Sequence, residues 1–286
     1  MPLPLFQVTR MTALLPLTIM ITGATDGLGR QVALNLACQG HCVLAHGRNP
    51  DKGAALLLEL QNGGAHPATR YFNADLASLS AVKALAAEVL ASQTTLNVLV
   101  NNAGIGPRAP GSPRQLNAEG IELMFAVNYL AGYTLSRALL PLLKSSIPAR
   151  IVNVASIGQQ PLDFEDVMMS DDYDDARAYR QSKLAQILDT FTLAEQIRDT
   201  GVTVNCLHPA TLMNTRMVYD SAYFPASMTT IDQGAAAVEN LISSPALEQV
   251  SGAYFDGQQE ARANDQAYDQ QARMKLLTLS AALTGY

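Results

Sequence analysis

A tyrosine and a lysine lie four residues apart in the stretch AYRQSKLAQ, as Tyr179 and Lys183. In a helix this spacing places both side chains on one face, one turn apart. A free tyrosine titrates near pH ~10 and is a poor acid or base at neutral pH. A lysine ammonium one turn away favours the tyrosinate, which makes the pair suited to moving a proton. The pair alone is weak evidence, because a solvated lysine near a half-buried tyrosine is also an ordinary surface arrangement.

A glycine-rich turn lies near the start of the chain, in ITGATDGLGR at 21–30, with glycines at Gly23, Gly27 and Gly29. It does not match the general G-x-G-x-x-G fingerprint, but the physical reason for the glycines is the same. They let the backbone turn tightly and approach a pyrophosphate that sits on a helix N-terminus. Because the turn joins an expected strand to an expected helix, it indicates a dinucleotide site. A purely structural turn is the alternative.

The residues that end the next two strands bear on which dinucleotide would bind. The second strand ends in His46, Gly47 and Arg48, where an NAD-selecting domain usually has an acid. With no carboxylate to repel a 2′-phosphate and a guanidinium that could fork onto it, NADP is favoured over NAD. A surface arginine near the next helix is the alternative reading of Arg48. Asp75, after the third strand, is placed to meet the adenine, or serves as a cap or turn residue.

Strand-like and helix-like segments alternate through the chain. Apolar, β-branched runs occupy 18–24, 41–47, 69–75, 96–104, 150–156, 202–210 and 252–257, and helical periodicity covers 28–39, 50–62, 78–92, 118–146, 177–199, 230–244 and roughly 264–284. Near-continuous apolar strands between helices indicate a parallel sheet covered on both faces. We therefore expect one doubly wound α/β (Rossmann) domain over 17–286, with a seven-stranded, mostly parallel sheet. Residues 1–16 are expected to be an N-terminal extension.

Composition excludes several classes of protein. Of 286 residues 48% are hydrophobic and 15% charged, which is typical of a packed globular domain and not of a disordered chain. The net charge of −6 without a Lys/Arg-rich run argues against nucleic acid as a partner. The apolar start is interrupted by prolines and Arg10 and lacks a cleavage site, so it does not resemble a signal peptide; Met11 is an alternative start.

The chain also lacks the usual signs of a membrane span or a metal site. No run of about 18 apolar residues suggests a membrane span. The cysteines Cys38, Cys42 and Cys206 show no metal spacing, and their low, odd number fits a reducing compartment. We expect no metal, no nucleic acid and no integral membrane partner, and a cytoplasmic location.

Two segments are candidates for the walls of a substrate pocket. Residues 157–176 contain seven acids and no Lys or Arg, which predicts either a solvated loop or a charge-selective flap; we call this segment the acidic flap. Residues 211–230, the substrate loop, are rich in apolar side chains, which suit a hydrophobic ketone, aldehyde or alcohol. The alternative for these side chains, Met213, Met217, Tyr219, Tyr223, Phe224 and Met228, is packing under a loop.

Four features occur together in a fixed order: T-G-x-x-x-G-x-G at 22–29, NNAG at 101–104, Ser156 at the end of the fifth strand, and Tyr179-x-x-x-Lys183. Together they resemble the short-chain dehydrogenase/reductase family, from about residue 19 to the end. Asn128 matches the family's helix asparagine. The long interval from Ser156 to Tyr179 is similar to the branch of retinol dehydrogenases and WW-domain oxidoreductase. Ala210 departs from the family, which usually has glycine after Pro209.

The resemblance implies an NADP-dependent oxidoreductase, such as a carbonyl reductase, that moves a hydride between the nicotinamide and a small hydrophobic carbonyl or alcohol. It implies that Tyr179 is the general acid/base, that Ser156 positions the substrate oxygen, and that Lys183 holds the nicotinamide ribose. Asn128 would hold a water that relays protons. The implied cofactor-binding residues are Thr22, Gly23, Thr25, Asp26, Gly27, Leu28, Gly29, Arg48, Asp75, Leu76, Asn102, Ala103, Gly104, Tyr179, Lys183, Pro209, Ala210, Thr211 and Leu212.

Two other functions are weighed against this one. A catalytically idle dinucleotide-binding sensor or scaffold is less favoured, because the Asn128, Ser156, Tyr179 and Lys183 set is intact. A light-driven reductase like protochlorophyllide reductase is disfavoured, because the acidic flap has no clustered cysteines. His208, which precedes Pro209, is expected to be structural, and a homodimer is compatible with the resemblance.

Overall fold

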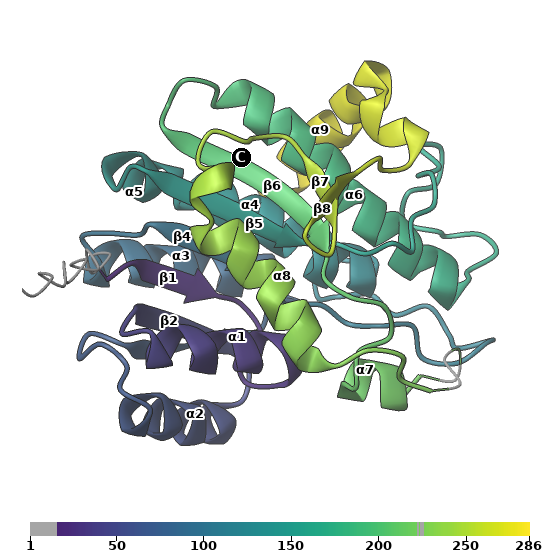
Figure 1. Cartoon of the computed structure of the whole chain (residues 1–286). Helices are drawn as coiled ribbons and strands as arrows, with labels where there is room; N and C mark the ends of the chain where they lie inside the picture. Colours follow the sequence, from purple (N-terminus) through teal and green to yellow (C-terminus); the bar gives the residue numbers. More distant parts are fainter. Residues whose placement is uncertain (1–15, 222, 224–225) are drawn as a thin grey trace, which may run out of the picture.

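An eight-stranded sheet forms the centre of the molecule (Figure 1). The structure is a computed structural model that describes residues 16–221, 223 and 226–286; most of the expected N-terminal extension and Phe224 lie outside them. The strands are β1 (Thr18–Ile21), β2 (Cys42–Gly47), β3 (Arg70–Asn73), β4 (Val98–Asn101), β5 (Ala149–Val154), β6 (Val202–His208), β7 (Tyr254–Asp256) and β8 (Gln259–Ala261). Their order is β3-β2-β1-β4-β5-β6-β7-β8, parallel throughout except for the antiparallel β7–β8 pair.

Helices cover both faces of the sheet. They are α1 (Gly27–Cys38), α2 (Pro50–Asn62), α3 (Leu79–Ser92), the π-helix η1 (Phe125–Leu130), α4 (Ala131–Ala138), α5 (Leu140–Ser145), α6 (Asp175–Gln196), α7 (Arg216–Tyr219), α8 (Ile231–Ser243), the short 3-10 turns η2 (Pro245–Leu247) and η3 (Asp265–Tyr268), and α9 (Gln270–Thr284). Figure 1 shows α1, α2 and α8 on one face and α3 and α4 on the other. Helix α9 packs against α6.

The alternation of side chains along the strands builds the two halves of the core. On β1, Ile19 and Ile21 belong to the cluster under α1 and α8, whereas Met20 between them belongs to the cluster under α3 and α4. Successive strand residues point to opposite faces, so a strand buried on both faces must be apolar at every position. This explains the near-continuous apolar runs in the sequence and confirms the expected doubly wound α/β domain.

Two elements differ from the sequence prediction. The single helix expected over 118–146 is wrong: regular helix begins only near Leu123, passes through the π-helix η1 and breaks at Leu139, just before Pro141. Proline lacks the N–H that a continuous helix needs, so the chain restarts as α5. The eighth strand was not expected, because QEA at 259–261 is short, polar and mostly exposed. This strand, β8, pairs antiparallel with β7 across a tight turn at Gly257.

The strand order places a switch point between β1 and β4. From β1 the chain winds outward through β2 and β3, and then returns to β4 on the other side of β1. Ligands of open parallel sheets bind outside the carboxyl ends of the strands at such a point. The glycine turn follows β1 and the NNAG segment follows β4, so the fold brings the two motifs together there.

Candidate active site

The glycine turn is shaped by the NNAG segment beside it. Gly23 has φ 66° and Gly27 has φ 50°, in the left-handed region that favours glycine. A Cβ at Gly29 would lie 2.3 Å from Asn102 Nδ2 and 2.4 Å from Gly23 O, and a Cβ at Gly23 would lie 2.9 Å from Ala103 Cα. At Gly23 and Gly29, the space that a side chain would need is therefore taken by Asn102 and Ala103 of the same chain.

Hydrogen bonds lock these two segments to each other. The Thr22 hydroxyl accepts from the backbone N–H groups of Asn102 and Ala103, both at 3.0 Å, and Asn102 Nδ2 donates to Thr22 O at 2.8 Å. Thr22 and Asn102 are both predicted cofactor residues, and their side chains are used to build the turn. Asn101 points away from the turn and donates to Ser136 and Asn153 inside the core.

His46 also supports the turn, in a role that sequence reasoning missed. Its Nδ1 accepts from Gly23 N–H at 3.4 Å, and its Nε2 lies 3.1 Å from Ala74 O. Burial lowers the pKa of His46 to about 4, so the ring is neutral near pH 7. A neutral ring donates from one nitrogen and accepts at the other, which matches a bridge between the turn and the end of β3. In the sequence, the only sign of this role was that His46 is a polar residue in an otherwise apolar strand.

The N-terminus of α1 is suited to an anion. Asp26 caps the helix by accepting from Gly27 N–H, and no acid lies within the first turn. The Asp26 carboxylate also pairs with Lys52 Nζ at 3.0 Å and lies 3.9 Å from Arg216, so its charge is offset. Leu28, a predicted cofactor residue, is buried in the core beneath the turn. The backbone of the turn, with its glycines and helix dipole, therefore fits a pyrophosphate.

Lys183 is buried where α6 crosses the end of β5. Its Nζ donates to Val154 O at 2.9 Å and to Gln186 Oε1 at 3.0 Å. Gly104 is adjacent, since a Cβ there would lie 3.5 Å from Lys183 Nζ and 3.3 Å from Asn128 Oδ1. The structure thus brings three predicted residues, Gly104, Asn128 and Lys183, to one place. Burial lowers the pKa of Lys183 to about 8.

Tyr179 lies on the same face of α6 as Lys183, as the four-residue spacing predicted. Lys183 Nζ is 5.8 Å from the centre of the Tyr179 ring. Burial raises the pKa of Tyr179, and a hydrogen bond with Ser156 opposes part of that rise. The net direction is therefore opposite to the lowering of the tyrosine pKa that the sequence predicted from Lys183. Ser156 is held in turn by Gly158 N–H, which donates to its hydroxyl at 3.0 Å.

Asn128 lies within the π-helix η1, and its side chain clamps a backbone segment. Its Oδ1 accepts from Ile105 N–H at 2.8 Å, and its Nδ2 donates to Ile105 O at 3.1 Å and to the Ser182 hydroxyl at 2.9 Å. π-Bulges occur frequently at functional sites. Asn128 thus positions the residue that follows NNAG and uses three of the four hydrogen bonds that its amide can make, which leaves one lone pair of Oδ1 for a water.

A model of the family described as short chain dehydrogenase matches residues 17–223, which is most of the chain and includes every motif described above. The chain belongs to the short-chain dehydrogenase family.

Curated relatives narrow the branch. The chain is 34% identical over 284 residues to mouse retinol dehydrogenase 13, with 94% of this chain and 84% of that protein covered. It is 35% identical over 291 residues to mouse retinol dehydrogenase 14, with coverages of 94% and 86%. This short-chain dehydrogenase is therefore an oxidoreductase enzyme of the retinol-dehydrogenase-like branch, as the sequence predicted.

Solved structures show the same fold. A short chain dehydrogenase from Salmonella enterica serovar Typhi has a TM-score of 0.71 and 25% identity, covering 86% of this chain and 97% of that one. One from Shigella flexneri, complexed with NADP, has a TM-score of 0.70 and 25% identity, with coverages of 85% and 97%. One from Escherichia coli, complexed with NADPH, has a TM-score of 0.69 at 25% identity, with coverages of 85% and 96%.

The predicted adenosine end of this short-chain dehydrogenase carries Arg48, Asp75 and Leu76. Arg48 is exposed at the end of β2 and lines a cavity of about 260 Å³ together with Ala77, Ile105 and Gly106. Asp75 forms a turn by accepting from Ala77 N–H at 3.0 Å, and the cap of α3 is Ser78 instead. Leu76 is buried.

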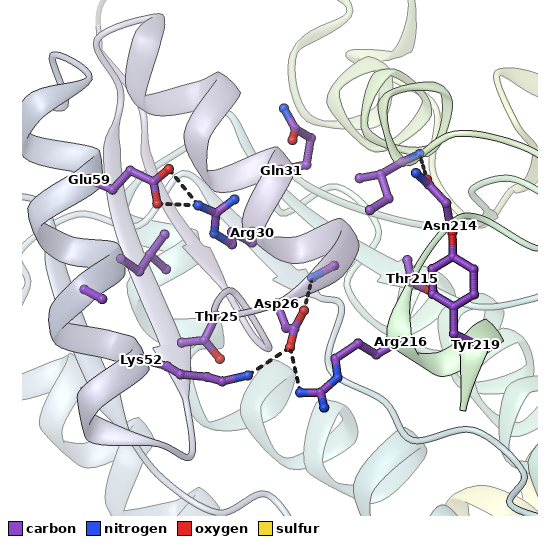
Figure 2. Close-up of a pocket in the computed structure, with 14 residues that line it drawn as sticks. Thr25, Asp26, Arg30, Gln31, Lys52, Glu59, Asn214, Thr215, Arg216 and Tyr219 are labelled. Carbon is purple, nitrogen blue, oxygen red and sulfur yellow. Dashed lines mark hydrogen bonds and ion pairs between the residues drawn. The ribbon is translucent and has the colours of Figure 1, made fainter. Parts of the chain in front are cut away.

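A second hollow of about 550 Å³ opens on the outer side of the glycine turn, between α1, α2 and α7 (Figure 2). Figure 2 shows Lys52 and Arg216 both directed at Asp26, and Arg30 paired with Glu59 at 2.5 Å. Thr25, a predicted cofactor residue, lines this hollow. The ion pairs are exposed and individually weak, but they join the substrate loop to the cofactor turn.

The acidic flap is anchored by arginines from outside it. Arg108, in the loop after β4, pairs with buried Asp175 at 2.8 Å, and Arg114 Nε donates to Met168 O. Asp174 is the N-cap of α6, where it accepts from Arg177 N–H. Asp174 and Asp175 therefore have structural roles at the start of α6. The flap contains no basic residue of its own, and its partners Arg108 and Arg114 come from a segment that is distant in sequence.

A half-buried tyrosine joins the flap to the segment just before η1. Tyr173 OH lies 3.1 Å from Glu122 Oε1 and 2.9 Å from Asp175 Oδ1. Burial raises the pKa of Glu122 and also that of Tyr173. The single phenol proton is donated to one of these two carboxyl groups at a time, and the two contacts together hold the Tyr173 ring between Glu122 and Asp175. The flap is thus pinned at its base while its outer acids face solvent.

The substrate loop matches its predicted role only in part. Met213 packs against Gly234 and Leu28 in the core, and Tyr219 lines the outer hollow of Figure 2, so neither lies at the site around Tyr179. Met217 contacts Gly106 beside the active site, and Met228 is exposed. The predicted apolar wall is therefore wrong for Met213 and Tyr219, since the loop folds back on the core at one end.

The residues after β6 form the start of this loop. Pro209 is buried, Ala210 is half-buried, and Thr211 Oγ1 lies 3.1 Å from His208 Nε2. Leu212 has φ 47°, an uncommon conformation for a residue with a side chain, whereas Ala210 is not among the residues with positive φ. Burial lowers the pKa of His208, which fits its predicted structural role.

Within residues 16–221, 223 and 226–286, no helix has both the length and the apolar character to span a membrane. Over the same residues, no three His, Cys, Asp or Glu side chains are grouped as metal ligands.

Proposed function

We propose that this enzyme is an NADP(H)-dependent oxidoreductase that interconverts a hydrophobic aldehyde or ketone and its alcohol, with Tyr179 as the general acid/base. The observation that carries the proposal is that Ser156 Oγ and the Tyr179 ring lie together beside Gly158, next to a buried Lys183 that lies beside Gly104. These groups line the carboxyl ends of the strands at the switch point, where a nicotinamide cofactor of this family would lie.

The preference for NADP is supported by two observations. Strand β2 ends in His46 and Gly47 without a carboxylate, and Arg48, which follows it, is exposed beside the cavity at the predicted adenosine end. Two of the solved relatives are complexed with NADP or NADPH. The glycine turn and the N-terminus of α1 would bind the pyrophosphate, and Lys183 the nicotinamide ribose.

The residues of the chain divide the remaining work. When bound, the nicotinamide supplies or accepts the hydride. Tyr179 gives a proton to the carbonyl oxygen in reduction and takes it back in oxidation. Ser156 hydrogen-bonds the same oxygen and sets its distance from Tyr179; such a donor contributes on the order of 2–4 kcal/mol to lowering the barrier. The Lys183 ammonium stabilises negative charge on the tyrosine oxygen as the proton leaves.

The substrate is proposed to be apolar. Met217, beside Gly106, the partly buried Ile105 and the buried Met124 supply apolar side chains near Tyr179. The names of the curated relatives indicate retinol as one substrate to include.

The test is a spectrophotometric assay of NADPH oxidation with ketones and aldehydes, and of NADP reduction with alcohols, including retinaldehyde and retinol. We expect turnover with hydrophobic members of the panel and a lower rate with NADH. NADPH binding without turnover of any substrate would instead support the idle dinucleotide-binding alternative.

A further inference from the structure

The Lys183 ammonium has a second neighbour on its own helix that the family motif does not include. Gln186, three residues further along α6, accepts from Lys183 Nζ through its side-chain Oε1 at 3.0 Å. The other acceptor is Val154 O, at 2.9 Å. Two of the three ammonium N–H groups are thus directed by the protein, which leaves one for the side that faces Gly104 and Asn128.

The orientation of the Gln186 amide follows from chemistry. An ammonium group only donates, so the oxygen of the amide and not its nitrogen must face Lys183. Gln186 is buried, and a buried polar side chain is costly unless it is hydrogen-bonded. This contact therefore offers a physical reason for a glutamine at a position that lies among Leu184, Ala185, Ile187 and Leu188.

A polar chain connects this turn of α6 to the sheet. The Thr190 hydroxyl donates to Gln186 O at 2.8 Å and accepts from Asn153 Nδ2 at 2.8 Å. Asn153 in turn accepts from Asn101 Nδ2, across the β4–β5 pair, at 2.8 Å. The part of α6 that carries Gln186 is therefore tied to the ends of two central strands.

We propose that Gln186 is a positioning residue that holds the Lys183 ammonium in its charged form and directs its remaining N–H toward the cofactor. This inference rests on the proposed function, in which Lys183 acts as a cation. Gln186 touches neither the substrate nor the reacting atoms, and it acts through Lys183.

The groups that face Lys183 make its charge sensitive to Gln186. On its own helix Tyr179 is a neutral phenol, because burial raises its pKa. On β6 His208 interacts with Lys183 through space, and burial keeps it neutral; Asp256, on β7, interacts with His208. Burial disfavours the ammonium, so a carbonyl oxygen at hydrogen-bond distance is a direct means of keeping it protonated.

Two substitutions at Gln186 should act in opposite directions. Gln186→Met keeps the approximate length and removes the strong acceptor, so Lys183 should lose its proton at lower pH. Gln186→Glu keeps the shape and adds a negative charge, so Lys183 should keep its proton to higher pH. Gln181→Met is the matched control, since Gln181 is a buried glutamine on α6 that donates to Pro161 O in the flap.

The measurement is the pH dependence of the NADPH dissociation constant, from the fluorescence of the bound nucleotide, and of kcat/KM. In wild type we expect NADPH affinity and kcat/KM to fall on the alkaline side of the pH profile, with a midpoint near pH 8. We call this fall the alkaline limb. It should move down by about one pH unit in Gln186→Met and up by about the same amount in Gln186→Glu. The limb of Gln181→Met should stay at the wild-type position, although its KM for substrate can change.

Opposite shifts support the inference, because loss of packing alone would not move the limb in two directions. Limbs that stay in place, or that move the same way in both variants, overturn it. If Gln186→Met does not fold, Gln186→Glu decides alone: an upward shift supports the role and an unchanged limb overturns it. A wild-type enzyme that binds NADPH without turnover refutes the proposed reaction, and the binding measurement still decides the role of Gln186.

Discussion

The side-chain amide of Asn128 hydrogen-bonds both the N–H and the C=O of Ile105, the residue that directly follows the NNAG segment. One side chain on the π-helix η1 thereby sets the path of the backbone that leaves β4 and passes Lys183. The clamp links the helix layer to the floor of the cofactor site.

We expect Asn128→Leu to destabilise the fold by about 1–3 kcal/mol, because it leaves partners of the amide unpaired. It should also weaken NADPH binding, since the segment at Gly104 and Ile105 loses its clamp. Urea unfolding and NADPH titration measure the two effects. Wild-type stability in this variant would contradict the clamp.

Tyr179→Phe should remove turnover and leave NADPH affinity nearly unchanged. The substitution deletes only the phenol oxygen, which is the proposed proton donor. Single-turnover rates and NADPH titrations of the same preparation separate the two effects. More than about a tenth of wild-type activity would be incompatible with the assigned role.

NADPH should bind about tenfold or more tightly than NADH, and Arg48→Ala should remove most of that preference. A charge-assisted fork on a 2′-phosphate is worth roughly 1.5–3 kcal/mol. Dissociation constants for both cofactors, in both proteins, are compared. Equal wild-type affinities for NADPH and NADH would contradict a role of Arg48 in selecting NADPH.

The acids of the flap should divide into two groups. Asp175→Asn should destabilise the enzyme, because it removes the charge partner of Arg108 from a buried site. The exposed pair Asp171 and Asp172, changed together to Asn, should leave stability within about 0.5 kcal/mol of wild type. Urea unfolding of both variants tests the division.

The outer acids of the flap should behave as a solvated rim. Neutralising Asp171 and Asp172 should then affect cationic and neutral substrates alike, and salt should act mainly on these outer acids. The ratio of kcat/KM for a matched substrate pair is the test. A selective loss of more than about 1 kcal/mol for the cationic member would show that the flap selects charge.

His46 should make the fold less stable in mild acid. Its folded pKa of about 4 lies below the ordinary value of 6.5, so its contribution is complete above pH 6.5 and is lost as pH falls toward 4. Between pH 7 and pH 5 the loss should be about 2 kcal/mol. His46→Gln should show a smaller drop in urea-unfolding free energy over that interval, and an equal drop would exclude His46 as the cause.

The sequence alone was sufficient for the features that depend on local period and order. Strands that are apolar at every position and separated by helical segments predict a parallel sheet covered on both faces, because successive strand residues point to opposite sides. The four-residue spacing of Tyr179 and Lys183 predicts a shared helix face, because the helix has 3.6 residues per turn. Glycines between a strand and a helix predict a tight turn at a helix N-terminus. Each inference needs only neighbours in the chain.

Tertiary structure decided which partners these residues meet. Lys183 donates a hydrogen bond to Val154 O at the end of β5, and Asp175 pairs with Arg108 from the loop after β4. His46 accepts from the Gly23 N–H because β2 lies beside β1. Contacts between distant segments depend on strand order and register, which no local pattern encodes. For the same reason Met213 and Tyr219, apolar in sequence, turn away from the site: their environment is set by where the substrate loop closes onto α8 and the outer hollow, and hydrophobicity alone does not specify which surface buries a side chain.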